Sequence, residues 1–369
     1  MNAPLALYVH WPFCVSKCPY CDFNSHVRES VDQKAWRKAL LADLAHEAQQ
    51  TQGLTLSSIF FGGGTPSLMD PATVAALIEA AGRHWRVTTD VEITLEANPS
   101  SVEAARFADL ASAGVNRVSL GLQSLEDEAL LFLGRAHDVA EGLAALETAQ
   151  REFDRVSFDL IYALPGQSEA KWCAELERAL SFGTGHLSLY QLTIEPGTRF
   201  AALAAKGELE TADPDCAAGL YELTQEMTEA AGLPAYEISN HARPGEESRH
   251  NLAYWRYGAY AGIGPGAHGR REGAFTGRHR KPENFLTALA RNGHGIEQET
   301  SIPLADSEVE ALLMGLRLRE GVPLDRVEGA LDRKAVDRLE AQGMLAIECG
   351  RLRATRPLLL DAILAEIVR

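Results

Sequence analysis

The sequence predicts an α/β protein: an open, partial (β/α)6 barrel of the TIM-barrel kind, followed by a small α+β C-terminal domain. The first observation is that apolar, β-rich stretches alternate six times with segments of helical period, which predicts a parallel sheet with helices outside it. The second is that polar or glycine-rich residues follow each apolar stretch. Six repeats are too few for a closed barrel of eight strands.

The six predicted strands and their helices occupy the first half of the chain. Strands are expected at 5–9, 57–61, 91–95, 115–120, 155–161 and 187–192. Helices are expected near 32–51, 71–83, 101–112, 138–151, 168–182 and 213–231. Because the carboxyl ends of parallel strands meet on one rim, the residues that follow the strands are the candidates for a functional site.

The second half is predicted to hold a connecting segment and the small domain. The part at 232–281 is rich in glycine and aromatic residues and is expected to be irregular. After a break in composition near 293–303, a winged-helix-like order of elements is expected at 305–319, 332–343, 344–348, 351–355 and 357–368. We therefore divide the chain into residues 1–231, 232–299 and 300–369.

Composition narrows the function classes. The 369 residues are 46% hydrophobic and 23% charged, as in an ordinary soluble protein. The sequence has neither a signal peptide nor an apolar run that approaches the roughly 20 residues of a membrane span. A cytoplasmic protein is therefore expected. The formal charge of −16 argues against nucleic-acid binding and against unaided adsorption to an anionic membrane. Any membrane association is expected to be peripheral, through a protein partner.

Three cysteines follow the first predicted strand at C-x3-C-x2-C spacing, namely Cys14, Cys18 and Cys21. Three thiolates are one short of the four that close a structural zinc site or saturate an iron–sulfur cluster. A [4Fe–4S] cluster held by them would keep one iron open. The alternatives are a zinc site completed by His10 or His26 and, less favoured, a disulfide. The scattered Cys173, Cys216 and Cys349 are expected to be ordinary buried thiols.

The cysteine motif, with the aromatic Tyr20 before its last cysteine, resembles that of the radical S-adenosylmethionine (SAM) superfamily. The resemblance implies a partial barrel, a [4Fe–4S] cluster and SAM bound at the open iron. The glycine run after the second strand resembles the loop that holds the amino group of SAM, which points to Gly63, Gly64 and Thr65. Glycine lets a backbone approach a ligand closely, although alone such a run is only a turn.

Four further polar residues lie at or just beyond strand ends, namely Glu96, Gln123, Arg135 and Asp159. The carboxylates suit the ribose or amino group of SAM, and the guanidinium suits its carboxylate. The alternatives are a helix cap, a surface ion pair and rim solvation. The stretches Leu-Glu-Ala-Asn-Pro and Ser-Leu-Gly-Leu-Gln-Ser resemble those of oxygen-independent coproporphyrinogen oxidases. This resemblance also implies that Tyr20 helps place the adenine and that Tyr8 stands close to SAM.

His250 begins the motif His-Asn-x-x-Tyr-Trp. A lone histidine is usually structural, but imidazole is also a common ligand of haem iron. The motif is similar to a signature of the HemW haem chaperones, which implies that His250 binds haem. A basic run follows, which either receives haem propionates or forms a solvated loop; it comprises Arg270, Arg271, Arg278, Arg280 and Lys281.

Two functions are favoured, and a radical SAM enzyme that acts on an unrelated substrate stays as a third alternative. The first is a haem chaperone that delivers haem to proteins such as membrane respiratory enzymes, with a cluster that governs oligomerisation, as in a homodimer, or haem release. The second is an oxygen-independent coproporphyrinogen III oxidase. Three features favour the chaperone. The His-Asn-x-x-Tyr-Trp motif is present, the stretch before Tyr8 is short, and Phe23 stands where those oxidases carry a further cysteine.

Overall fold

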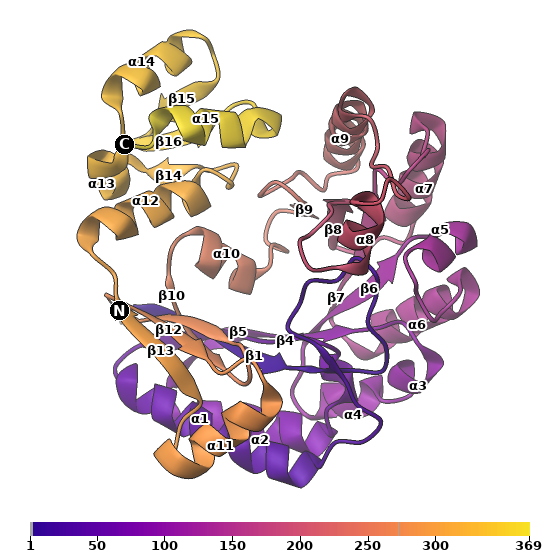
Figure 1. The fold of residues 1–369 in the computed structure, drawn as a ribbon, viewed down its shortest axis with the longest axis vertical. Coiled ribbons are helices and arrows are strands. Elements are labelled where there is room, and N and C mark those ends of the chain that lie inside the picture. The colour runs from indigo at the N-terminus through magenta and orange to yellow at the C-terminus, as the bar shows by residue number, and fades with distance from the viewer. Residues whose placement is uncertain (1–2, 272) are drawn as a thin grey trace.

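In the computed structural model, which describes residues 3–271 and 273–369, one eleven-stranded sheet is the centre of the fold (Figure 1). Its order is β13-β12-β11-β10-β1-β4-β5-β6-β7-β8-β9. The six predicted strands are confirmed and pair in parallel; they are β1 (Pro4–Trp11), β4 (Thr55–Gly63), β5 (Arg86–Ala97), β6 (Arg117–Gln123), β7 (Arg155–Tyr162) and β8 (His186–Gln191). The sheet ends at β13 and β9, so it forms the predicted open, partial barrel.

The prediction of an irregular segment at 232–281 is wrong. β9 (Asn240–Ala242) lies antiparallel to β8, and β10 (Ala259–Ile263) lies parallel to β1. β11 (His268–Arg271), β12 (Ala274–Arg278) and β13 (Ile296–Ser301) continue that edge as an antiparallel meander. The glycines that suggested a loop allow close backbone approach instead. A Cβ on Gly262 would stand 1.8 Å from the carbonyl oxygen of His268.

The predicted barrel helices are confirmed, with the third divided in two: α1 (Gln33–Gln50), α2 (Pro71–His84), α3 (Ser101–Ala104), α4 (Phe107–Ser112), α6 (Val139–Glu152), α7 (Glu169–Ser181) and α9 (Pro214–Ala230). Short helices that were not predicted are α5 (Asp127–Phe132), α8 (Arg199–Ala204), α10 (Arg249–Trp255) and α11 (Pro282–Asn292). Aspartates begin several helices by accepting backbone N–H bonds, among them Asp32, Asp138 and Asp213.

The C-terminal part has its own hydrophobic core, which includes Leu312, Val336 and Leu352. The five predicted elements are present in order, namely α12 (Leu304–Gly315), α14 (Arg333–Ala341), β15 (Leu345–Glu348), β16 (Arg351–Ala354) and α15 (Leu360–Ile367). The short β14 (Val322–Pro323) and α13 (Leu324–Val327) were not predicted. Helix α10 lies between this part and the sheet (Figure 1) and contacts both α12 and β4. No helix in the described ranges is long and apolar enough to cross a membrane.

Candidate functional site

The loop after β1 carries the three motif cysteines. Phe13, directly before Cys14, is buried and packs edge-on against Trp36, with ring centroids 5.1 Å apart. The short strand β2 (Phe13–Cys14) pairs with β3 (His26–Val27), which joins the two ends of the loop. Between these anchors, the three half-buried free thiols are held on one short segment at the rim of the barrel.

The thiols of this loop lie close enough to influence one another. Burial, together with the neighbouring thiols, raises the pKa of Cys14 and Cys21. Nearby positive charge would favour their thiolate forms. No three His, Cys, Asp or Glu side chains in the described residues are arranged to hold a single metal ion. The donor set, three thiols on one loop, fits a larger centre such as a [4Fe–4S] cluster with one open iron.

The zinc alternative with His10 finds no support in the geometry. Nδ1 of His10 lies 2.9 Å from the hydroxyl of Tyr8, and its Nε2 lies 3.0 Å from the carbonyl oxygen of Asn24. Burial lowers the pKa of His10 to about 4, so the ring is neutral. Both ring nitrogens are engaged within the protein, and His10 therefore fixes the loop rather than offering a ligand.

The glycine run at the end of β4 packs against the cysteine loop. A Cβ on Gly63 would stand 2.6 Å from the ring of His10, and Gly63 has a φ of 115°. A Cβ on Gly64 would stand 2.6 Å from the carbonyl oxygen of Phe13 and 3.0 Å from Sγ of Cys14. Residues with a side chain would push the loop away, so these glycines bring the two strand ends together.

Thr65 and Arg135 meet through Asn98, which the sequence analysis did not single out. The amide of Asn98 donates to Oγ1 of Thr65 at 3.1 Å, and its Oδ1 accepts from Nη2 of Arg135 at 2.7 Å. Nη1 of Arg135 lies 3.3 Å from Sγ of Cys18. A guanidinium is thus held beside the cysteine loop, where it can meet a carboxylate.

Glu96 and Asp159 place two carboxyl groups inside the barrel. Burial and the nearby Asp159 raise the pKa of Glu96 to about 8, and burial raises that of Asp159 to about 6. Glu96 accepts from the backbone N–H of Gly63 at 3.2 Å, and Ser119 donates to Asp159 at 3.3 Å. A cationic group bound near them would favour their ionised forms.

Gln123 and Tyr20 flank the same rim. Gln123 has a φ of 70°, in the left-handed region, where β6 ends and its register with β7 shifts. Such conformations in residues other than glycine occur mostly where the surrounding structure imposes them. Tyr20 packs against Phe200, and burial raises the pKa of its hydroxyl. Most of the predicted SAM residues therefore lie at the carboxyl ends of strands or on the loops that follow them, whereas Tyr8 and Asp159 lie within β1 and β7.

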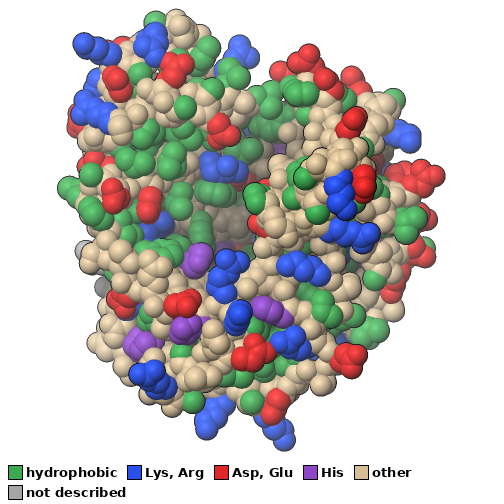
Figure 2. Space-filling view, viewed as in Figure 1, with side chains coloured by type: hydrophobic (Ala, Val, Ile, Leu, Met, Phe, Trp, Pro, Cys, Tyr) green, Lys and Arg blue, Asp and Glu red, His purple; other side chains and the backbone are tan. Residues whose placement is uncertain are grey.

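His250 lies inside the barrel, although its motif stands outside the βα repeats in the sequence. It lines a cavity of about 290 Å³, which we call the lumen cavity. Figure 2 shows a hollow in this face, between the C-terminal part and the region of β8 and β9. The lumen cavity is lined by Tyr8, Phe60, Glu96, Tyr190, Glu237, Ser239, Asn240, His250, Asn251, Tyr254, Trp255 and Arg317. His250 thus shares a cavity with Tyr8 and Glu96, two of the predicted SAM residues.

The side chain of His250 is held with one ring nitrogen free. Nδ1 lies 3.2 Å from Oγ of Ser58 on β4, and the buried Nε2 has no hydrogen-bond partner among the described residues. The ring stacks on Phe60, with centroids 4.8 Å apart. Burial lowers the pKa of His250 to about 4, so at neutral pH the ring is unprotonated and one nitrogen can bind a metal.

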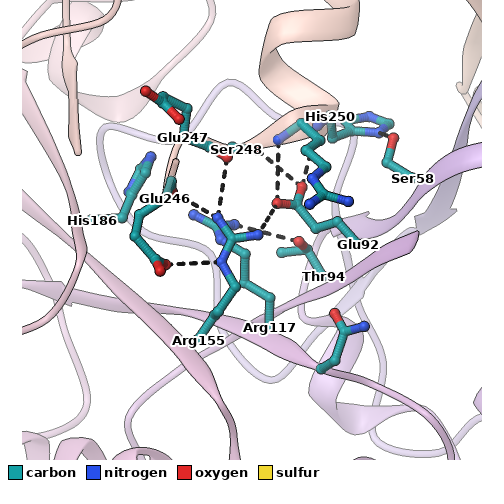
Figure 3. A network of polar contacts seen from close by, with 12 residues as sticks. Ser58, Glu92, Thr94, Arg117, Arg155, His186, Glu246, Glu247, Ser248 and His250 are labelled. Atoms are coloured by element: carbon teal, nitrogen blue, oxygen red, sulfur yellow. Dashed lines mark hydrogen bonds and ion pairs between the residues drawn. The ribbon is translucent and has the colours of Figure 1, made fainter. Parts of the chain in front are cut away.

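A buried carboxylate anchors the helix that carries His250 (Figure 3). Glu92 on β5 accepts from the backbone N–H groups of Arg249 and His250, each at 3.2 Å, and from Nη1 of Arg155 at 2.8 Å. Burial alone would raise the pKa of Glu92, but Arg117 and Arg155 outweigh it and lower the pKa. The first turn of α10 is therefore fixed to the interior of the sheet by a charged group.

The basic run was predicted to receive haem propionates, and the structure contradicts this role for Arg270 and Arg278. Arg278 is fully buried between Asp43 and Glu47, with Nη2 2.5 Å from the Glu47 carboxylate. Arg270 stacks on Tyr257, its guanidinium carbon 3.6 Å from the ring centroid. These guanidiniums fasten the meander to α1 and the C-terminal part, because a charge at such depth needs a partner.

The prediction that the three scattered cysteines are buried is also wrong. Cys216 and Cys349 are exposed, and Cys173 is half-buried. Cys349 has a φ of 50° in the turn between β15 and β16, and Cys216 lies in the first turn of α9. Composition alone does not reveal that Cys216 and Cys349 stand at a helix start and in a turn that face solvent.

Two family models match the chain. The model of the radical SAM superfamily matches residues 8–179, and that of the HemN C-terminal domain matches residues 302–357. The first match contains the cysteine motif and all the predicted SAM residues. The second covers most of the small C-terminal part.

Curated relatives match over nearly the full chain. Radical S-adenosyl methionine domain-containing protein 1, mitochondrial, of Mus musculus is 40% identical over 95% of this chain and 84% of its own length. Heme chaperone HemW of Escherichia coli is 39% identical over 88% of this chain and 85% of its own length. Heme chaperone HemW of Mycobacterium tuberculosis is 36% identical over 99% of this chain and 95% of its own length.

A solved structure supports the fold. The coproporphyrinogen III oxidase HemN of Escherichia coli, described as a radical SAM enzyme, superposes with a TM-score of 0.81. The match covers 99% of this chain and 90% of that one at 22% identity. At this identity the similarity establishes a common architecture, and function has to be argued from the site.

Proposed function

Because the chain belongs to the radical SAM superfamily and, within it, to the family of the heme chaperone HemW, we propose that it is a haem chaperone, which binds haem and passes it to haem-requiring proteins. Relatives of that name match most of the chain at 36–39% identity. The oxidase with the similar fold is more distant in sequence.

One observation in the site carries the proposal. His250 offers a buried, neutral imidazole whose Nε2 lacks a partner in the described part of the chain, at the wall of the lumen cavity. Histidines that bind metals commonly have the other ring nitrogen held by a protein group, and here Ser58 occupies that position. Tyr8, Phe60 and Tyr254 surround the ring with aromatic surface, which suits a flat macrocycle.

We assign the cofactors by the same reasoning. Cys14, Cys18 and Cys21 would hold a [4Fe–4S] cluster, which when bound supplies an open iron and an electron for SAM. The proposed SAM site would place the carboxylate of SAM on Arg135 and its amino group near the glycine loop. Its residues are Tyr8, Tyr20, Gly63, Gly64, Thr65, Glu96, Gln123, Arg135 and Asp159. In a chaperone this cluster has a structural or regulatory task, in oligomerisation or haem release.

We further propose that haem recipients, including membrane respiratory enzymes, are reached by protein contact. The formal charge of −16 disfavours direct adsorption to anionic lipid. A cluster-dependent homodimer is the proposed oligomer. It is supported by three apolar side chains exposed on or beside the cysteine loop, Val15, Phe23 and Val27. Sizing of cluster-loaded and cluster-free protein tests it, and one unchanged mass would argue against it.

The haem proposal is tested by titrating haem into anaerobically reconstituted protein and recording the Soret band. We expect one haem per chain and a spectrum that changes on His250→Ala. A Cys14→Ser variant should keep haem binding and lose haem transfer to a recipient apoprotein. If wild type shows no specific haem binding, the chaperone proposal fails. The oxidase alternative would then be tested by vinyl formation from coproporphyrinogen III with SAM and a reductant.

A further inference from the structure

The lumen cavity has a cationic group on its wall, and this group comes from the C-terminal part. Arg317 lies just after α12, and its guanidinium carbon stands 4.5 Å from the centroid of the Trp255 ring. It is the only lysine or arginine among the described residues that line the cavity. A guanidinium above an indole face is stabilised there and keeps its N–H edges available.

Arg317 has donors that the protein does not use. Its buried Nε has no hydrogen-bond partner in the described ranges, and Nη2 makes one long contact of 3.4 Å with Oε2 of Glu237. Glu237 is buried, and its Oε1 accepts from the N–H of Ser239 at 2.9 Å and the amide of Asn240 at 2.6 Å, so Arg317 is needed only at Oε2 and through one of its N–H groups. A guanidinium carries five N–H donors, so Arg317 can bind another acceptor.

The acceptor that fits is a single carboxylate. The planar guanidinium pairs with carboxylate or phosphate through two parallel hydrogen bonds. The carboxylate of Glu237 also lines the cavity, and it disfavours an acceptor with two negative charges. The body of the ligand has to be flat and apolar, since Phe60, Tyr254 and Trp255 form much of the wall.

We propose that Arg317 binds a carboxylate of the aromatic macrocycle whose metal is held by His250. This inference rests on the haem-chaperone proposal and adds the group that recognises the propionate side of the ligand. It moves that role from the basic run, where Arg278 is consumed by Asp43 and Glu47, to the C-terminal part. The bound ligand would then connect α10 to the C-terminal part and close the cavity from that side.

The test compares haem with haem dimethyl ester, which lacks both carboxylates, in the full chain after anaerobic reconstitution. Wild type should bind the diacid more tightly than the ester by roughly ten- to a hundredfold, as expected for a charge-assisted hydrogen bond. Arg317→Gln should remove most of that preference and leave ester binding unchanged. Arg317→Lys, which keeps the charge without the planar fork, should retain part of it and provides a folded comparison.

The matched control is Arg319→Gln. Arg319 lies two residues away in the same segment, but its side chain is exposed and paired with Glu229 on the surface. This variant should keep the full preference for the diacid. His250→Ala should weaken diacid and ester alike and change the spectrum.

The outcomes separate the two proposals. If wild type binds both ligands equally, or if Arg317→Gln and Arg317→Lys keep the full preference, the Arg317 inference is refuted while the haem site stands. If neither ligand binds wild type specifically, the haem-chaperone proposal and the inference fall together.

Discussion

Replacing Glu92 by glutamine should detach the helix that positions His250. The substitution keeps the shape of the side chain but removes the charge that faces Arg117 and Arg155. Breaking a buried ion pair destabilises a protein by roughly 3–5 kcal/mol. Arg155 is one-fifth exposed and keeps its contact with Glu246, which lowers our expectation to about 2–3 kcal/mol. The loss should be concentrated at α10, whose first N–H groups bind the carboxylate.

The assay combines urea denaturation with hydrogen exchange of the α10 amides and the haem titration. In Glu92→Gln, we expect faster exchange at Arg249 and His250 and a weaker His250-dependent Soret band. Glu246→Gln is the control, because that carboxylate also pairs with Arg155 but is about two-fifths exposed. An exposed pair contributes up to about 1 kcal/mol, so the control should change little. Equal effects of the two variants on α10 exchange would refute the anchoring role.

The same carboxylate gives a pH signature. The pKa of Glu92 is lower in the folded protein than its usual value, so folding is favoured when the group is ionised. This stabilisation is present above the usual carboxyl pKa and is lost as the pH falls through the lower folded value. Glu92→Gln should therefore lose stability mainly near neutral pH and approach wild type in acid.

Two further predictions concern the cluster side of the site. Gly64→Ala places a Cβ against the carbonyl oxygen of Phe13, so the reconstituted variant should contain clearly less iron than wild type. The control is Gly82→Ala, which has open space around its Cβ and should take up iron normally. Equal iron contents in the two variants would contradict the packing argument. Burial and Asp159 raise the pKa of Glu96 to about 8, so the folded chain holds its proton more tightly than the unfolded chain. Ligand-free protein should lose stability as the pH rises from about 5 to about 8, and Glu96→Gln should flatten this trend in denaturation curves; an unchanged slope would refute it.

The barrel could be predicted from the sequence because its strands and helices have strong periodicity and each strand end carries a polar or glycine residue. The segment after α9 could not, because its strands are short and three of them, β10, β11 and β12, contain a glycine. In β10, Gly262 is needed where the backbone passes His268, which a sequence pattern does not distinguish from a turn. Helix α10, with seven residues, is likewise too short for a periodic signal and is held by Glu92 instead.

The residues of the candidate site likewise fall into those that the sequence could predict and those that it could not. Residues at strand ends, such as Glu96, could be anticipated, since parallel strands bring their ends to one rim. Asp159 was expected at such an end, but it lies within β7. Asn98 stands two positions beyond Glu96 and could have been found by the same rule. Arg317 could not, because nothing in its sequence context distinguishes it from Arg319, its exposed neighbour. Only the position of the C-terminal part over the cavity makes the two arginines different.

The unpaired buried polar atoms of residues that line the lumen cavity are the strongest argument that something binds there. Nε2 of His250, Oδ1 of Asn240 and Nε of Arg317 are all buried without a hydrogen-bond partner in the described residues, and all three residues line this cavity. Each unpaired buried group costs a protein roughly 1–3 kcal/mol. They come from α10, β9 and the C-terminal part, three segments that meet only in the folded chain. A ligand that satisfies them would recover part of that energy, so binding should stabilise the contact between the barrel and the C-terminal part as well as the ligand itself.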